Sequence, residues 1–297
     1  MLVVAHAVSA SFEPVQILPP VVVGIGYAVR ARTLARQGRP VPTWRRTAFW
    51  AGIALILTTL VSPVANAGHE LILAHMAQHL LLADIGALLL VLGCTGPLLQ
   101  PLLGLPVFKQ LRVLVHPAVA LPLWIVNLYV WHLPFLYQAA LSSEPVHALQ
   151  HTAFLAFGVN MWLALLGPLP APEWFGNGAR FMYLVTVRLA GALLGNVFIW
   201  SGKVFYPDYR AGEASWHISA LNDQGVAGTI MMVESSIVTI LLLGWLFMKT
   251  ARDAEERQVL VEYAHDHGLE LSERRAARAV GAGRGAELRH RLEQAVR

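Results

Sequence analysis

Two pairs of histidines in this chain have the spacing of neighbours on one face of a helix. His75 and His79 are four residues apart, and His147 and His151 repeat that spacing. Side chains at positions i and i+4 meet on a helix surface, so each pair can offer two ring nitrogens to one ion. Both pairs, and His132, lie in or beside long apolar stretches. Imidazole is costly to bury in hydrocarbon, so this gathering favours a metal site, a haem site or a proton path.

Other side chains narrow the choice of metal. Met76 stands inside the first pair, and Met231 and Met232 lie in a later apolar stretch. Thioether and imidazole without thiolate suit copper, as Cu(I), better than magnesium or calcium. The single cysteine, Cys94, allows neither an internal disulfide nor a Cys-based zinc motif. Asp223 is predicted to be a carboxylate that fixes a histidine tautomer. The simpler alternative makes each histidine an interfacial anchor or interhelical hydrogen-bond partner, and each methionine a packing residue.

The composition indicates a multi-span membrane protein. Of 297 residues, 56% are hydrophobic and only 13% are charged, whereas soluble domains carry about 25% charged residues. Apolar stretches near the length needed to cross ~30 Å of hydrocarbon recur along the chain. We predict an all-α polytopic bundle of about seven transmembrane helices, with no cleaved signal peptide and no nucleic-acid partner. The predicted spans are residues 15–33, 47–66, 71–93, 117–139, 146–167, 180–202 and 226–248.

Basic residues orient this bundle. Most of the 22 lysines and arginines lie in the connection after the first span, after the third span, or beyond residue 248. Under the positive-inside rule these segments are cytoplasmic, which places the N-terminus outside and the C-terminus inside. We therefore predict a transmembrane helical domain over residues 1–248 and a charged cytoplasmic tail, helical or partly disordered, over residues 249–297.

The five histidines share one depth in this arrangement. With a rise of ~1.5 Å per residue, His75 and His79 lie roughly 6–12 Å below the outer end of the third span. His132 comes near the outer end of the fourth span, and His147 and His151 lie in the first turns of the fifth. The sequence therefore predicts one outer-side histidine layer built by three helices.

Three charged residues are predicted deeper in the membrane. Asp84 in the third span and Arg188 in the sixth have matching depths, so we expect them to form an ion pair that holds these helices together. Glu234 in the seventh span is expected to be protonated, paired or part of a proton path.

Four stretches of the chain resemble a known family. They run from His75 through His79 into three leucines, from Trp131 to Tyr137, from His147 to His151, and from Asp223 to Met232. In this order and spacing they resemble the CtaG-type assembly factors associated with bacterial caa-type cytochrome c oxidases, over residues 69 to about 248. One position departs from the expected pattern, because Met232 is followed by Val233 where an aromatic residue is expected.

The resemblance implies a multi-pass protein of the bacterial cell membrane that helps an active haem–copper oxidase form, with the oxidase subunits as its partners. The family's motif histidines correspond to His75, His79, His132, His147 and His151. Our leading hypothesis is therefore a copper-handling assembly factor without enzymatic activity. Its outer-side His/Met cluster would take Cu(I) from an extracytoplasmic donor and present it to the catalytic subunit.

Three alternatives remain open on the residues alone. A b-type haem cytochrome could use histidines from different helices, although axial ligands approach opposite haem faces and neighbours on one helix seldom serve together. A proton or metal-ion transporter would use Asp84, Glu234 and the histidines. A metal-free scaffold would hold oxidase subunits during assembly.

Overall fold

The structure is a computed structural model that describes residues 14–61, 63–104, 112–169, 171–281 and 283–296. These residues form helices and connections and include no β-strand, which confirms the predicted all-helical fold. The chain divides into two compact units, one ending at Ile237 and the other beginning at Val238. The first unit holds every residue of the predicted site.

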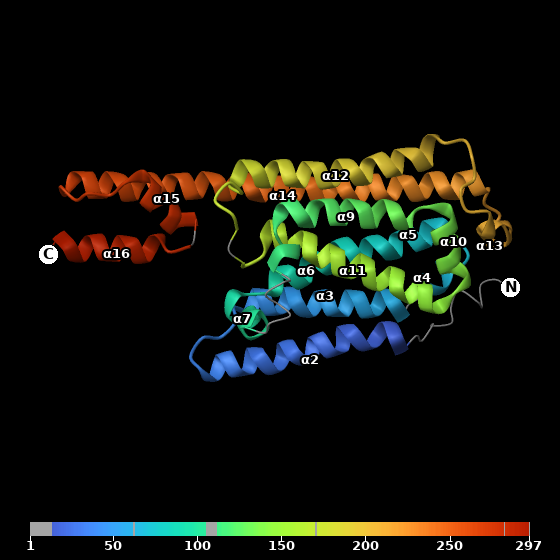
Figure 1. The fold of residues 1–297 in the computed structure, drawn as a ribbon, viewed down its shortest axis with the longest axis horizontal. Helices are drawn as coiled ribbons and strands as arrows, with labels where there is room; N and C mark the ends of the chain where they lie inside the picture. Colours follow the sequence, from blue (N-terminus) through green and yellow to red (C-terminus); the bar gives the residue numbers. More distant parts are fainter. Residues whose placement is uncertain (1–13, 62, 105–111, 170, 282, 297) are drawn as a thin grey trace. The chain divides into compact units, whose positions relative to one another are not determined.

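The first unit is a bundle of long helices with short helices at its two ends (Figure 1). Its elements are α2 (Pro14–Arg36), α3 (Thr43–Val61), α4 (Pro63–Ala67), α5 (Ile72–Leu80), the π-helical η1 (Leu81–Gly86), α6 (Ala87–Gly93), α7 (Gly96–Gly104), α9 (Pro117–Trp131), α10 (Pro134–Ser142), α11 (Glu144–Leu166), α12 (Asn177–Trp200), the 3₁₀-helix η2 (Pro207–Tyr209), α13 (Arg210–Ser215) and the first part of α14 (Ala220–Asp266).

Five helical stretches among the described residues are long and apolar enough to cross a membrane: Gln16–Arg36, Ile72–Gly93, Glu144–Leu166, Asn177–Trp200 and part of α14. The pair α9 and α10 makes a sixth if the bent pair is one span. A helix also stands at the predicted second span, in α3, but it is not among these candidates. The protein is therefore a multi-pass membrane protein, and the count of seven spans stays a prediction.

The fourth predicted span, 117–139, is not one straight helix. Helix α9 ends at Trp131, α10 begins at Pro134, and their axes differ by 70°. Pro134 lacks a backbone N–H and disfavours helical backbone in the residue before it, so Leu133 is extended at φ −64° and ψ 130°. The bend puts His132 at the end of α9, facing the interior of the bundle.

Small residues let the central helices approach closely. A Cβ added at Gly158 of α11 would lie 2.1 Å from the carbonyl oxygen of Ala83 in η1. Gly195 of α12 and Gly228 of α14 meet in the same way, since a Cβ on Gly195 would be 2.9 Å from the Gly228 carbonyl oxygen. Backbones in membrane bundles pack this closely only through residues without bulky side chains. The first contact joins α11 to the π-helix that continues α5, the two segments that carry the histidine pairs, and the second joins α12 to α14.

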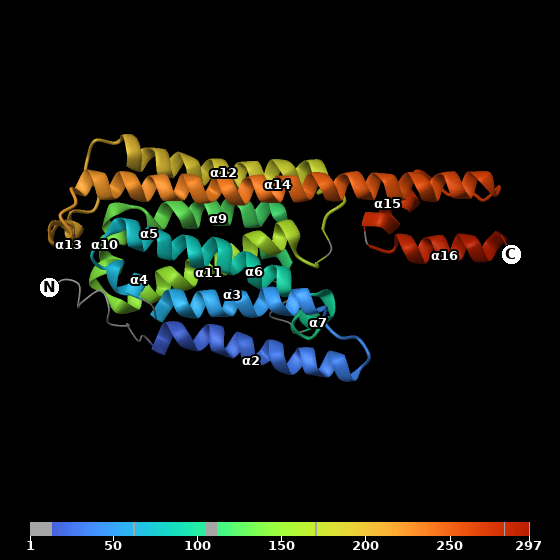
Figure 2. The same cartoon turned by 180° about the vertical axis from the view of Figure 1, so that it is seen from behind.

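The two ends of the first unit differ (Figures 1 and 2). The short helices α4, α10 and α13 gather at one end and α7 lies at the other. Near α7, arginines bind the carbonyl groups that follow α6: Arg45 Nη1 donates to Cys94 O at 2.7 Å, and Arg30 Nη2 donates to Pro97 O at 2.9 Å. The histidine pairs sit in the half nearer α4 and α10.

Within the described residues, the second unit contains three helical segments. It contains the rest of α14, together with α15 (Glu273–Gly281) and α16 (Gly285–Val296). Gly283 has φ +68°, a conformation that suits glycine between two helices. The core of this unit consists of Leu260, Ala264, Val280, Leu288 and Leu292.

Candidate functional site

Helix α5 presents the first histidine pair to the interior of the bundle. The rings of His75 and His79 are buried, with centroids 4.3 Å apart. Their helix begins where Asp223 of α14 accepts hydrogen bonds from the backbone N–H groups of Ile72, at 2.7 Å, and Leu73, at 3.1 Å. The start of α5 is thus fixed by a carboxylate about 150 residues away in sequence.

Helix α11 presents the second pair opposite the first. The His147 and His151 rings are buried and lie 4.2 Å apart between centroids. Across the interface, His75 is 5.4 Å from His147, and His79 is 5.3 Å from His151. The structure therefore brings the two sequence-predicted pairs into one four-histidine cluster.

Three of these histidines are arranged as metal ligands. One ring nitrogen from each of His75, His79 and His151 lies within 4.8 Å of the others. His75 Nδ1 donates to Gly68 O at 3.3 Å, and His151 Nδ1 donates to Gln16 Oε1 at 2.8 Å. The Nε2 atom of each of these two rings is buried and has no hydrogen-bond partner among the described residues.

This pattern has a chemical meaning. A hydrogen bond from one ring nitrogen fixes the tautomer, so the other nitrogen carries a lone pair and can bind a metal. Histidine ligands in metal sites almost always have such a partner on the non-ligating nitrogen. His79 has no described partner on either nitrogen, so either one can carry the lone pair that binds a metal. The three-histidine site thus has the donors and the orientation for a borderline or soft metal ion.

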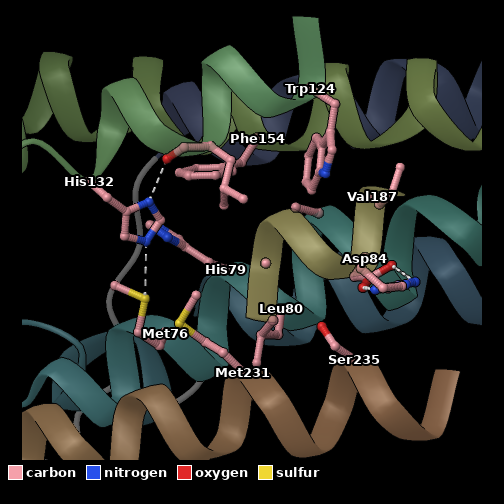
Figure 3. A pocket seen from close by; sticks show the side chains of 14 residues that line it. Met76, His79, Leu80, Asp84, Trp124, His132, Phe154, Val187, Met231 and Ser235 are labelled. Atoms are coloured by element: carbon pink, nitrogen blue, oxygen red, sulfur yellow. Dashed lines mark hydrogen bonds and ion pairs between the residues drawn. The ribbon is translucent and has the colours of Figure 1, made fainter. Parts of the chain in front are cut away.

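His132 lies beside this site without joining the three ligand atoms. Its ring is 6.4 Å from that of His79 between centroids. His132 Nδ1 donates to Leu128 O at 2.6 Å, and Nε2 is 3.5 Å from Met76 Sδ. Met76 is buried, and its thioether points toward the His132 ring (Figure 3).

A tyrosine layer, Tyr137, Tyr206 and Tyr209, covers the cluster. Tyr206 Oη donates to His132 O at 2.8 Å, and Tyr209 Oη donates to Gly68 O at 3.1 Å. The Tyr137 and Tyr206 rings stack at 3.9 Å. Burial raises the pKa of Tyr206 and Tyr209 well above the usual tyrosine range, so their hydroxyls remain donors.

The cluster has one histidine at the surface. His69, just after α4, is exposed, and its ring lies 5.2 Å from that of His147. A series of imidazole rings therefore leads from the surface to the buried trio. The ring centroid of His147 is 5.2 Å from that of His69, 5.4 Å from that of His75 and 4.2 Å from that of His151.

Asp223 has a different partner from the one predicted. Its carboxylate was expected to fix a histidine tautomer, but both oxygens are engaged by the N-terminus of α5. The tautomers are fixed instead by the Gly68 carbonyl, the Leu128 carbonyl and the Gln16 amide. Backbone carbonyls are present at every position, so no sequence signal marks the ones that serve here. Gln16 lies in an apolar stretch, where a lone amide is the one signal that could have found it.

The deeper charged residues form a second polar group. Arg188 Nη1 and Nη2 bind the two oxygens of Asp84, as the matching depths predict, and the guanidinium lies 5.1 Å from the centre of the Trp162 ring. Glu234 is half-buried, and neither of its carboxylate oxygens has a hydrogen-bond partner among the described residues. Asp84 belongs to the π-helix η1, an irregularity that occurs often at functional sites.

A small pocket separates the histidines from the Asp84–Arg188 pair (Figure 3). Its volume is about 50 Å³, and Met76, Met231 and His79 are among its lining residues. Met232 is not, because its sulfur accepts from Asn196 Nδ2 at 3.5 Å. Of the methionines proposed from the sequence, Met76 and Met231 therefore face the site.

Proteins of three mycobacteria are similar in sequence to this chain. An uncharacterized protein of Mycobacterium bovis and one of Mycobacterium tuberculosis are each 27% identical over 271 residues, covering 83% of this chain and 41% of the relative. A third, from Mycobacterium leprae, is 24% identical over the same length. The chain thus spans about two fifths of the length of these relatives. No solved structure matches it significantly.

The sequence profile of one protein family covers most of the bundle. It matches residues 25–253, which include all four histidines of the α5–α11 cluster, His132, and the Asp84–Arg188 pair. This match confirms the resemblance found in the motifs around the histidines. The chain belongs to the cytochrome c oxidase caa3 assembly factor family, Caa3_CtaG.

Proposed function

We propose that this protein is a multi-pass assembly factor of the bacterial cell membrane that handles copper for the catalytic subunit of a haem–copper cytochrome c oxidase. Copper is the cargo of this process. The observation that carries the proposal is the convergence of His75, His79 and His151, with unpartnered Nε2 atoms on two of the rings, inside an apolar bundle.

The donor set supports copper as the cargo. Imidazole nitrogens with nearby thioethers, and no thiolate, bind copper well and magnesium or calcium poorly. One nitrogen from each of three rings lies within 4.8 Å of the others, and two of these rings are oriented by a hydrogen bond through Nδ1, which makes a site that can release its ion as well as bind it. The exposed His69 gives an extracytoplasmic donor an entry point beside His147.

The space beside the histidines favours a metal ion over haem. The pocket next to His79 and His132 has a volume of about 50 Å³, whereas sites for organic ligands enclose roughly 300–1,000 Å³. The two histidines of each one-turn pair also share one helix face, so the two members of a pair cannot reach opposite faces of one porphyrin. A b-type cytochrome is therefore the weaker reading of this geometry.

A deletion strain tests the proposal directly. We expect a strain without this protein to make an oxidase that retains its haem spectrum but lacks copper in the catalytic subunit. The triple variant His75→Ala/His79→Ala/His151→Ala should fail to restore copper, while His265→Ala, which removes an exposed histidine from the second unit, should restore it fully. Immunodetection of each variant in the membrane controls for expression.

The same strain separates the alternatives. Full rescue by the triple variant would show that the protein acts as a metal-free scaffold. A reduced-minus-oxidised spectrum of the purified protein with a Soret band would favour a cytochrome. Normal copper loading in the deletion strain would overturn the copper proposal.

A further inference from the structure

We propose that Met76, His132 and Met231 form a second, softer metal subsite that takes Cu(I), beside the three-histidine site. The identity of its physiological cargo rests on the proposed function, whereas the subsite itself rests on the geometry of these three side chains. Met76 lies on α5, His132 at the end of α9 and Met231 on α14, and all three line the pocket of Figure 3.

The contact between His132 Nε2 and Met76 Sδ is not a hydrogen bond, because neither atom carries a hydrogen to donate. His132 Nδ1 lies 2.6 Å from the carbonyl oxygen of Leu128, which can only accept, so Nδ1 carries the ring proton of the neutral imidazole. Nε2 is then an acceptor, and it faces Met76 Sδ, also an acceptor, at 3.5 Å. Two atoms with lone pairs therefore face each other, and a cation between them would bind to both.

A proton is a poor candidate for that cation. It would make His132 an imidazolium in the interior of the bundle, where an uncompensated charge is costly. The carboxylate that lines this pocket belongs to Asp84, and Arg188 already pairs with both of its oxygens. A soft metal ion gains two covalent-type bonds from the same lone pairs, which offset the cost of its charge.

The separation of the two atoms fits a shared metal ion. Typical bonds of about 2.0–2.1 Å to imidazole nitrogen and about 2.3 Å to sulfur, at a tetrahedral angle, place the two ligand atoms about 3.5 Å apart. The observed distance from His132 Nε2 to Met76 Sδ is 3.5 Å. The observed separation is therefore the one that a bridging metal ion needs.

The pocket supplies the space and a third ligand. Its volume of about 50 Å³ holds an ion and little else. Met231 is buried in its wall, and Figure 3 shows the Met231 thioether pointing toward the same space as that of Met76. Two thioethers and one imidazole favour Cu(I) over divalent ions. His79 lines this pocket and also belongs to the three-histidine site, so the two sites share a wall.

Selenium labelling tests this subsite on the intact protein. The full chain is purified with selenomethionine in place of methionine and loaded with Ag(I), a redox-stable probe of Cu(I) sites, and then with Cu(I) itself. X-ray absorption at the selenium edge should show a metal neighbour. Met76→Leu/Met231→Leu should remove it and lower the bound Ag(I) by about one equivalent. Met232→Leu is the matched control, because it removes the adjacent thioether outside the pocket.

Three outcomes decide the proposal. A selenium–metal signal that survives in Met232→Leu and disappears in the double variant supports the subsite. Metal bound only through nitrogen in the labelled wild-type protein overturns it, even if the double variant fails to fold. A clear selenium–metal signal together with a copper-replete oxidase in the deletion strain would retain the subsite and refute the proposed function.

Discussion

At the scale of single residues, the hydrogen bond made by one ring nitrogen decides which nitrogen of each histidine is left to bind a metal ion. His75, His132 and His151 each use Nδ1 to donate a hydrogen bond, to Gly68, Leu128 and Gln16 respectively, and so each directs Nε2 inward. His79 and His147 have no described partner on either nitrogen. The first group is oriented by these hydrogen bonds, whereas packing against neighbouring rings holds the second group in place.

Gln16 is the side chain on which this orientation can be tested. We expect Gln16→Leu to weaken Cu(I) binding by about 10- to 100-fold, because loss of such an orienting partner has an effect of that size. Competition against a colorimetric Cu(I) chelator measures it. Gln37→Leu, at an exposed position, is the control and should leave affinity unchanged. Equal affinities for the two variants would mean that Gln16 does not set the His151 tautomer.

The Asp84–Arg188 pair makes a different prediction, concerning stability. Removing one member of a buried pair leaves an uncompensated charge, so Arg188→Gln or Asp84→Asn alone should destabilise the protein by about 3–5 kcal/mol. The double variant should lose clearly less than the sum of the two, since both charges are gone. Unfolding in detergent followed by circular dichroism provides the free energies.

An exposed pair supplies the comparison for that cycle. Arg289 and Glu293 form an i,i+4 ion pair on the surface of α16, and such pairs contribute about 0–1 kcal/mol. Their single and double variants should therefore show almost no coupling. Additive losses at Asp84 and Arg188 as well would argue that the two do not interact in the membrane.

At the scale of elements, Asp223 connects α14 to the helix that carries His75 and His79. The first N–H groups of a helix have no partner within it, and α5 has no capping side chain of its own. The Asp223 carboxylate fills that role from another helix. The position of the histidine pair therefore depends on how α14 packs.

Replacing Asp223 should loosen this connection. We expect Asp223→Ala to lower the free energy of unfolding by about 1–3 kcal/mol through loss of charge-assisted hydrogen bonds, and to weaken metal binding at the pair as well. Asp223→Asn keeps one acceptor and should be intermediate. Asn222→Ala changes the neighbouring exposed residue and should have little effect on either measurement. An unchanged metal affinity in Asp223→Ala would show that the hydrogen bonds from Asp223 to α5 do not influence metal binding by the histidines.

The elements also show what the sequence could predict. Apolar length located the long helices, and a rise of ~1.5 Å per residue put five histidines at one depth. That argument yields depth along a helix but not rotation around it. It could not reveal that His132 ends α9 at a 70° bend, that η1 is π-helical, or that Tyr206 and Tyr209 cover the cluster. These features depend on contacts between segments far apart in the chain.

At the scale of the whole first unit, two arginines and the histidine cluster lie at opposite ends. Arg30 and Arg45 bind carbonyl groups beside α7, whereas His69 lies just after α4 and the histidine pairs lie on α5 and in the first turns of α11, toward the end that holds α4 and α10 (Figure 2). Arginines therefore have a structural role at their end in addition to the one the positive-inside rule assigns them. If that end is cytoplasmic, the exposed His69 opens the site to the outside, as a route from an extracytoplasmic donor requires.

Labelling in intact cells tests this orientation. In a Cys94→Ala background, which removes the single native cysteine, His69→Cys should react with a membrane-impermeant maleimide added outside. Gln37→Cys, exposed in the turn between α2 and α3, should react only after the cells are opened, because the arginines around it are held in the cytoplasm. If Gln37→Cys alone is labelled in intact cells, the topology is the reverse of the predicted one. His69 would then face the cytoplasm, and the copper donor would have to be a cytoplasmic protein.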